Sequence, residues 1–120
     1  QLTGIKDTDL IIMSNMDDRS LFDLCIANKL NRYGSQLCSD ENFWRRRFVS
    51  RFGKPEIKNR SWKNFYMTII HYISQIGQNG KNFVSLTEDA IKTGKLDIVD
   101  FLFVRIERPT QDQVNKFLEL

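Results

Sequence analysis

SWKNFYMTIIHYISQI, residues 61–76, predicts the longest helix of this chain. Its apolar side chains recur every three or four positions, as a helix with one buried face requires. They are Trp62, Phe65, Tyr66, Ile69, Ile73 and Ile76. Ser61 stands just before them, where a hydroxyl can accept a hydrogen bond from a free backbone N–H of the first turn. We therefore expect a helix over residues 62–76 that begins after Ser61.

Short helices are predicted on the N-terminal side of this segment, over residues 7–16, 19–30, 30–38 and 43–52. Their expected N-caps are Asp7 or Thr8 for the first, Asp18 for the second and Ser39 for the fourth. Gly34 is expected to break or loosen the third helix. Gly53 follows the fourth with Pro55 close behind, a combination that is typical of a helix end.

Helices are also predicted on the C-terminal side. Residues 85–88 and 110–113 fit the capping-box pattern, Gly94 is expected to end the first of these helices, and a second covers about 96–105. No stretch alternates apolar and polar residues for more than a few positions, so strands are not expected. The sequence predicts an all-α fold of seven or eight short helices, divided into residues 1–76, a loop at 77–84 and residues 85–120.

Charge is distributed unevenly along the chain. The formal net charge of +3 includes a segment, residues 45–63, with eight basic residues and one acidic residue. We call its eight basic residues the basic belt: Arg45, Arg46, Arg47, Arg51, Lys54, Lys58, Arg60 and Lys63. Such a segment can bind phosphates or an acidic protein surface, but it can also be a solvated face with local pairs to Asp40 or Glu41.

The two cysteines, Cys25 and Cys38, lie beside apolar residues and are 13 positions apart. We expect them to be buried, reduced thiols, as is usual for a protein kept in a reducing intracellular compartment. No apolar run is long enough to span a membrane, and residues 1–10 lack the pattern of a signal peptide. These features lead us to expect a cytoplasmic protein with no membrane partner.

Residues 7–53 resemble an F-box-like domain of the kind found in large DNA viruses. The resemblance is carried by Met16-Asp17, Ser20-Leu21, Leu24-Cys25, Leu37-Cys38, Asp40 and Phe43-Trp44-Arg45, in that order. The downstream stretch SWKNFY (61–66) is similar to a further segment of these viral proteins, so the match covers roughly residues 5–66. The chain has Ile5-Lys6-Asp7-Thr8 where F-boxes usually have Leu-Pro before the first helix.

This resemblance implies the work of an adaptor. An F-box domain presents an apolar surface of short helices to the small adaptor subunit of a cullin-type ubiquitin ligase, and another segment holds the target protein. Transferred to this sequence, the expected docking residues are Leu10, Ile11, Met13, Met16, Leu21 and Leu24. Each of them could equally belong to the core, because a small domain needs most of its apolar side chains inside. Trp44 is expected to be a core residue.

Residues 85–103 resemble one ankyrin repeat, a pair of short antiparallel helices. The matching residues are Leu86, Ala90, Gly94, Leu96, Ile98, Val99 and Leu102. One repeat cannot bury both of its faces, and arrays usually need about three. We expect this pair either to continue in a longer chain or to pack on the helical core as a cap.

Few residues of the chain are suited to catalysis. His71 is the only histidine and lies beside the apolar face of the predicted long helix, so we expect a partly buried structural imidazole. There is no Cys-x-x-Cys pair, no glycine-rich phosphate loop and no G-x-S-x-G motif. The acidic pairs 17–18 and 40–41 lie at predicted helix starts, where capping explains them. We expect no enzyme, no metal site and no cofactor.

Two other functions stay open at this point. A nucleic-acid-binding domain would use the basic belt, and its affinity would fall steeply with salt. A structural or virion-associated protein would use the apolar surface to self-associate. The adaptor hypothesis differs from both, because it predicts binding that depends on residues such as Leu10 or Leu24 and only weakly on salt.

Overall fold

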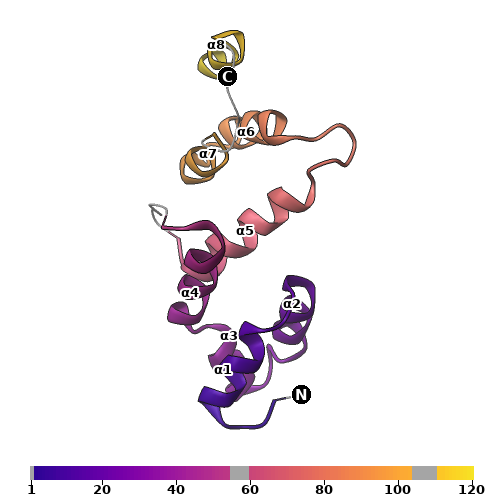
Figure 1. Ribbon diagram of the computed structural model, residues 1–120, viewed down its shortest axis with the longest axis vertical. Coiled ribbons are helices and arrows are strands. Elements are labelled where there is room, and N and C mark those ends of the chain that lie inside the picture. The colour runs from indigo at the N-terminus through magenta and orange to yellow at the C-terminus, as the bar shows by residue number, and fades with distance from the viewer. Residues whose placement is uncertain (1, 55–59, 104–110) are drawn as a thin grey trace. The chain divides into compact units, whose positions relative to one another are not determined.

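A computed structural model describes residues 2–54, 60–103 and 111–120 of the chain (Figure 1). Within these ranges the regular structure is helical and no strand occurs, which confirms the predicted all-α class. The helices are α1 (Lys6–Ser14), α2 (Asp18–Ala27), α3 (Arg32–Cys38), α4 (Glu41–Phe52), α5 (Trp62–Ser74), α6 (Phe83–Lys92), α7 (Leu96–Phe103) and α8 (Gln111–Glu119). No helix in the described part of the chain is long and apolar enough to cross a bilayer.

By its internal contacts the chain forms two compact units. Unit 1 comprises residues 1–54 and 61–66, and unit 2 comprises residues 55–60 and 67–120. The division falls inside α5, between Tyr66 and Met67. The loop at 77–84, where the sequence predicts a division into domains, lies within unit 2.

Short polar side chains begin most of these helices, often one residue away from the predicted cap. Asp17 caps α2 by accepting from the Ser20 N–H, and Asp40 caps α4 by accepting from the Phe43 N–H. The predicted caps Asp18 and Ser39 are therefore each off by one position. Ser61 does accept from the Asn64 N–H, as the sequence predicts for the start of α5.

Two other predicted helix starts are wrong in detail. Helix α1 follows Ile5, whose side chain makes no capping hydrogen bond, so neither Asp7 nor Thr8 is the cap. Helix α6 begins at Phe83 because Asn82 and Ser85 form a reciprocal capping box, which makes Ser85 the third residue of the helix instead of its cap. The predicted cap Thr110 lies outside the described residues.

The core of unit 1 is aromatic. Trp44 and Phe48 on α4 are fully buried together with Phe65 and Tyr66 of α5. The rings of Phe48 and Phe65 lie 5.1 Å apart, and those of Trp44 and Tyr66 lie 5.6 Å apart. The indole N–H of Trp44 donates to the Cys38 carbonyl over 2.9 Å, which satisfies its one polar group inside the core. The prediction that Trp44 is a core residue is confirmed.

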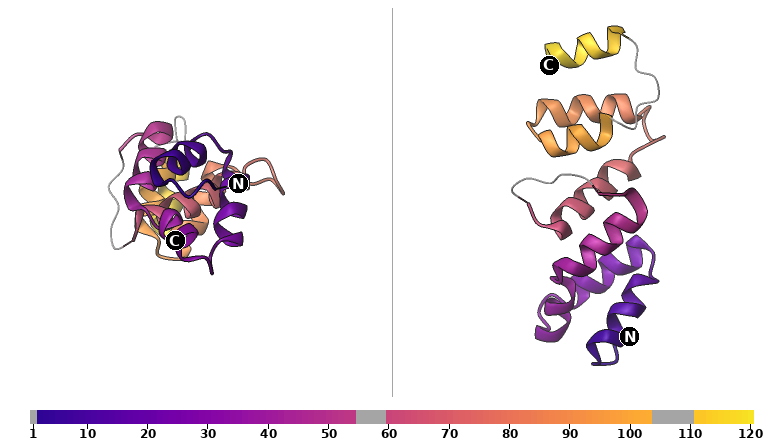
Figure 2. Two further views of the ribbon diagram at one scale, coloured as in Figure 1. Left: turned by 90° about the horizontal axis from the view of Figure 1, so that it is seen from below. Right: turned by 60° about the vertical axis from the view of Figure 1, so that its left-hand side comes forward.

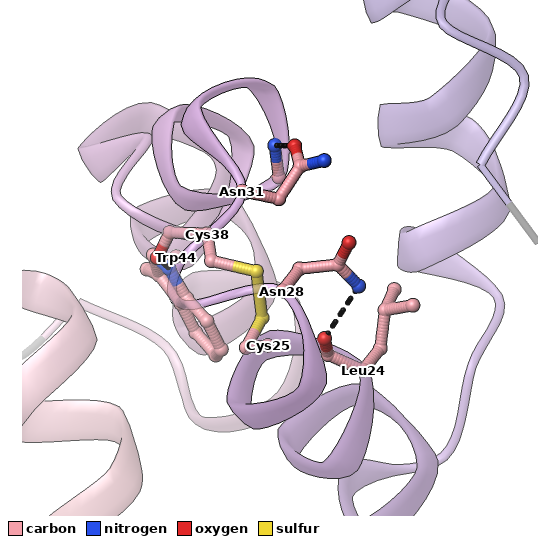
Figure 3. The surroundings of a disulfide bond; sticks show 7 residues. Leu24, Cys25, Asn28, Asn31, Cys38 and Trp44 are labelled. Atoms are coloured by element: carbon pink, nitrogen blue, oxygen red, sulfur yellow. Dashed lines mark hydrogen bonds between the residues drawn. A yellow bond between two sulfur atoms is a disulfide. The ribbon is translucent and has the colours of Figure 1, made fainter.

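Cys25 of α2 and Cys38 of α3 form a disulfide (Figure 3), so the prediction of reduced thiols is wrong. Both residues are buried, as expected, but their Cα atoms lie 5.7 Å apart, within the range that a disulfide bridges. Sequence spacing could not show this, because the distance depends on how α3 folds back beside α2. The disulfide closes the α2–α3 turn covalently.

Gly34 also belongs to this close approach of α2 and α3. Its backbone N–H donates to the Asn31 side chain, and it lies within a continuous α3, so it does not break the helix as predicted. A Cβ at this position would stand 2.5 Å from the Cβ of Asn28. Because such a distance is sterically forbidden, glycine is needed here for contact between helices.

Unit 2 contains a packed helical pair, α6 and α7, which lie side by side in the right-hand view of Figure 2. Gly94 joins them with φ of +70°. The Lys95 N–H donates to the Ala90 carbonyl and the Gly94 N–H donates to the Ile91 carbonyl, which is the Schellman arrangement that ends a helix. The predicted helix end at Gly94 is confirmed.

The interior of unit 2 is formed by Leu86 and Ala90 of α6 with Ile98 and Leu102 of α7. Leu96, which also belongs to the ankyrin-like pattern, is exposed. The Arg60 guanidinium pairs with the buried Asp97 carboxylate over 2.8 Å. Helix α8 contributes a ring contact between Phe117 and Phe103 and an ion pair between Lys116 and Glu88.

Candidate functional site

The six docking residues predicted from the F-box resemblance have different exposures. Met13 and Leu21 are fully buried, so they belong to the core and cannot form a docking surface in this structure. Leu10, Met16 and Leu24 are half-buried, and Ile11 is 65% exposed. The structure therefore leaves four of the six able to contact a partner.

Other apolar side chains of α1 and α2 are exposed, and the sequence analysis did not single them out. Ile12 is exposed on α1, and Ile5, the residue just before this helix, is exposed as well. Ile26 is exposed near the end of α2, and Leu30, in the turn after it, is 93% exposed. A scan for apolar residues outside the 3-4 repeat could have found Ile12 and Ile26, but the exposure of Leu30 depends on where α2 ends.

Asp9 of α1 is hydrogen-bonded to the residues before this helix and to α3. It is a fully buried carboxylate that accepts hydrogen bonds from the Thr3 N–H, the Thr3 hydroxyl, the Gly4 N–H and the Tyr33 hydroxyl. Burial alone would raise the pKa of Asp9, but these hydrogen bonds outweigh it and the net effect lowers the pKa. The carboxylate thus ties residues 3–4 and α3 to α1.

Tyr33 provides a prediction for alkaline pH. Its burial and its bond to Asp9 raise the pKa of the Tyr33 hydroxyl from 10.0 to about 12. In the unfolded chain this hydroxyl ionises near 10, so its contribution to stability is present below pH 10 and is lost as the pH rises toward 12. Ultraviolet titration should show one tyrosine ionising near pH 12, and Asp9→Asn should move that transition down. Asp7→Asn, an exposed carboxylate on the same helix, should leave it in place; an equal shift in both variants would refute the assignment.

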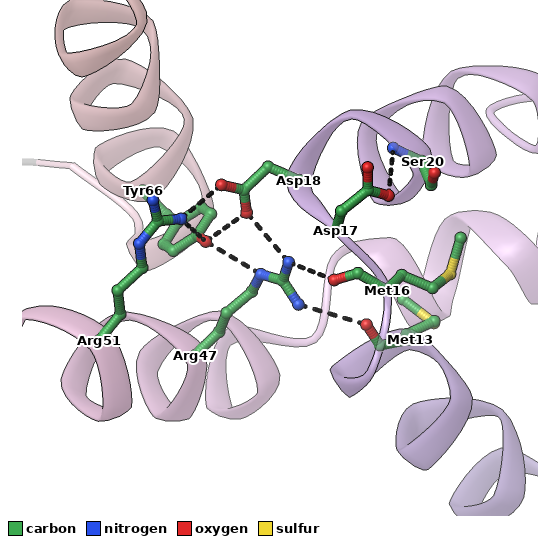
Figure 4. Close-up of polar contacts among 8 residues, drawn as sticks. All are labelled: Met13, Met16, Asp17, Asp18, Ser20, Arg47, Arg51 and Tyr66. Carbon is green, nitrogen blue, oxygen red and sulfur yellow. Dashed lines mark hydrogen bonds and ion pairs between the residues drawn. The ribbon is translucent and has the colours of Figure 1, made fainter.

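A polar cluster connects α1, α2, α4 and α5 in unit 1 (Figure 4). The Asp18 carboxylate pairs with Arg47 over 2.9 Å and with Arg51 over 2.5 Å, and it accepts a hydrogen bond from the Tyr66 hydroxyl. The hydroxyl of Tyr66 in turn accepts from Nε of Arg47 over 3.0 Å. The Asp18 and Arg47 side chains are only 18% and 13% exposed, so this pair is shielded from solvent.

Arg47 also completes the end of α1. Its guanidinium donates to the Met13 carbonyl over 3.3 Å and to the Met16 carbonyl over 2.7 Å. Carbonyls at the end of a helix have no partner within it, and a cation at that end is favoured by the helix dipole. Arg47 is therefore a structural residue that holds α1 against α4.

The same cluster determines two pKa directions. Burial would raise the pKa of Asp18, but hydrogen bonds from Tyr66, Arg47 and Arg51 together lower it. Burial and the bond to Asp18 raise the pKa of Tyr66. At neutral pH Asp18 is therefore an anion and Tyr66 a neutral donor, which is the arrangement that the hydrogen bonds require.

A pocket of about 390 Å³ opens beside this cluster. It is lined by Ser14, Met16, Phe43, Arg46, Arg47, Ser50, Arg51 and Tyr66, and we call it the arginine pocket. Five of these residues lie on α4 at positions 43, 46, 47, 50 and 51, which is the spacing of one helix face. Arg46 and Arg47 are neighbours in sequence, and both reach this pocket from adjacent parts of that face.

The structure assigns the members of the basic belt to different places. Arg46, Arg47 and Arg51 line the arginine pocket, whereas Arg45 does not. Arg60 pairs with Asp97 in unit 2, and Lys58 lies outside the described residues. The carboxylates that engage the belt are Asp18 and Asp97. Asp40 instead caps α4, and Glu41 accepts from the Trp62 and Lys63 N–H groups at the start of α5.

The one histidine of the sequence, His71, belongs to unit 2. His71 is exposed on α5, so the expectation of a partly buried imidazole is wrong. No group of three or more histidine, cysteine, aspartate or glutamate side chains in the described ranges is arranged to hold a metal ion. The chemistry that the described residues offer is apolar contact at α1 and α2 and anion binding at the arginine pocket.

Neither the models of protein families, nor the curated proteins, nor the solved structures contain a match to this chain.

Proposed function

We propose that unit 1 is a protein-docking domain that performs no reaction of its own. The observation that carries this proposal is the exposure of several large apolar side chains on two neighbouring short helices. They are Ile5 just before α1, Ile11 and Ile12 on α1, and Ile26 and Leu30 at and beyond the end of α2. Exposed apolar side chains are typical of protein-interaction sites.

The partner that we propose is the small adaptor subunit of a cullin-type ubiquitin ligase. The F-box-like order of motifs in residues 7–53 supports it, as do the half-buried Leu10, Met16 and Leu24 and the exposed Ile11. In this proposal unit 1 docks to the ligase, and the ankyrin-like pair α6–α7 contributes to holding a target protein. The transfer chemistry belongs to other subunits, and the site of action is the cytoplasm of a host cell infected by a large DNA virus.

The proposal is tested by direct binding of the whole chain to the purified adaptor subunit, measured by calorimetry. Ile11→Gln and Leu30→Gln should each weaken binding about tenfold or more, because a buried apolar contact is replaced by an amide. Both positions are exposed, and glutamine is a good helix former, so folding should be unchanged. Leu96→Gln is the matched control, since Leu96 is 72% exposed in unit 2.

Four results would count against the proposal. The wild-type chain could fail to bind the adaptor subunit, or all three variants could weaken binding equally. A third contrary result is light scattering that shows a stable self-associated species which Ile11→Gln dissolves, because the same side chains would then contact a second copy of the chain. Binding that falls steeply with salt would also contradict an apolar interface.

A further inference from the structure

The arginine pocket has an uneven arrangement of buried and exposed groups. Phe43 and Tyr66 are buried beneath it and Arg47 is largely buried. Ser14, Arg46, Ser50 and Arg51 are exposed at its edge. Arg46, Ser50 and Arg51 therefore present hydrogen-bond donors to a concave space whose lining includes the rings of Phe43 and Tyr66. The Ser14 hydroxyl already donates to the Leu10 carbonyl.

The charges of this pocket are not balanced. Arg46, Arg47 and Arg51 line the pocket, and in the described ranges the one carboxylate that pairs with any of them is Asp18, which leaves two positive charges in excess. Arg47 is fully engaged with Asp18, Tyr66 and two backbone carbonyls. Arg46 takes part in no ion pair within the described ranges, and Arg51 is 48% exposed. Arg46 and the free edge of Arg51 are thus available to a ligand.

We propose that the arginine pocket binds a phosphate monoester carried by a side chain of a protein partner. A phosphate monoester has a charge of about −1.5 to −2 at neutral pH and three acceptor oxygens. These match the Arg46 guanidinium, the exposed edge of the Arg51 guanidinium and the Ser50 hydroxyl. A carboxylate would neutralise only one of the two excess charges. This inference deepens the proposed function by giving the chemistry of one group on the partner, and it rests on that function for the partner being a protein.

A nucleic acid fits this site less well. Duplex or single-stranded binding uses a track of cations that follows successive phosphates. Within unit 1, the arginines that line the pocket converge on one concave anion site, and Arg47 among them is already held by Asp18. A single phosphate on a side chain needs only that one site.

The test uses the whole chain and the probe N-acetyl-phosphoserine amide, with binding followed by NMR of the arginine Nε–H groups. Arg46→Gln should raise the dissociation constant about tenfold or more, because a charge-assisted hydrogen bond is lost. Arg45→Gln is the matched control: it removes the same charge from the adjacent position of α4, which does not line the pocket, and should change the constant by no more than about twofold. Ser50→Ala should weaken binding less than Arg46→Gln.

A second probe, a pH series and an oligonucleotide test whether the pocket selects a phosphate. N-acetyl-aspartate amide should bind at least about tenfold more weakly than the phosphoserine probe. Phosphoserine binding should strengthen from pH 5 to pH 7, as the phosphate takes on its second charge near pH 6. Equal losses of phosphoserine affinity in Arg45→Gln and Arg46→Gln would refute the proposed phosphate site. Tighter binding of a single-stranded oligonucleotide than of phosphoserine, with a dependence on Arg45, would refute it as well.

This experiment is separate from the test of the proposed function. Phosphoserine binding by a chain that ignores the cullin adaptor subunit would refute the proposed function alone. Adaptor binding by a chain that ignores phosphoserine would refute the phosphate site alone.

Discussion

Asp18→Asn should lower the free energy of unfolding of unit 1 by roughly 3 kcal/mol, toward the lower end of what breaking a buried ion pair costs. The substitution keeps the shape of the side chain but leaves the largely buried Arg47 guanidinium without its counter-ion. It also removes the charged acceptor of the Tyr66 hydroxyl. Urea denaturation followed by tryptophan fluorescence measures the effect, because Trp44 lies in the same core.

The control for this prediction is Asp23→Asn on the same helix. Asp23 is exposed, so its loss should change stability by no more than about 0.5 kcal/mol. Arg51→Gln should cost about 1 kcal/mol or less, since half of that side chain is in solvent. If Asp18→Asn and Asp23→Asn had equal effects, the cluster would have no role in stability.

Because the pKa of Asp18 is lowered in the folded state, the wild-type chain should lose the stabilisation that Asp18 provides only as the pH falls below about 4.

Removing the disulfide should lower the free energy of unfolding by about as much as Asp18→Asn does. The double variant Cys25→Ala/Cys38→Ala opens a closed loop whose ends are 13 positions apart. For a loop near this length the lost restriction of the unfolded chain corresponds to about 3 kcal/mol. The midpoint of urea denaturation should fall in the variant, and a reducing agent should lower the wild-type midpoint by a comparable amount.

The variant supplies its own control, because a reducing agent should have no effect on it. Mass spectrometry of the chain isolated under non-reducing conditions gives the outcome that would contradict the structure, namely a mass corresponding to two free thiols. The redox state of the two cysteines also bears on the proposed cytoplasmic site of action. Thiols are usually kept reduced in the cytosol, so we expect the chain to be less stable there than in an oxidising buffer.

Local sequence signals were enough to predict the helices. The apolar spacing of residues 62–76 and the Ser61 cap predict α5, and Gly94 predicts the end of α6, because each signal acts over one or two turns. The predictions of Asp18 and Ser39 as caps are each wrong by one position. Adjacent residues of similar chemistry compete for the cap position, and their propensities do not separate them.

The candidate sites depended on contacts that local signals do not contain. Asp18 meets partners 29, 33 and 48 positions away in Arg47, Arg51 and Tyr66. The neighbouring positions Ile11 and Met13 have similar chemistry, yet one is exposed and the other is buried. Which of them faces outward depends on how α1 is rotated, and the buried Asp9 and the Arg47 guanidinium hold that rotation. Neither interaction can be inferred from the spacing of apolar residues.

The position of Phe65 and Tyr66 in unit 1 has a consequence for protein synthesis and for the choice of fragments. A nascent chain that has released α1 to α4 from the ribosome still lacks the two rings that fill their interior and the hydroxyl that Asp18 requires. Productive folding of the N-terminal half must therefore wait until translation has passed residue 66. For the same reason, an expression fragment cut at Lys54 should aggregate, whereas one that extends beyond Tyr66 retains every side chain of that interior.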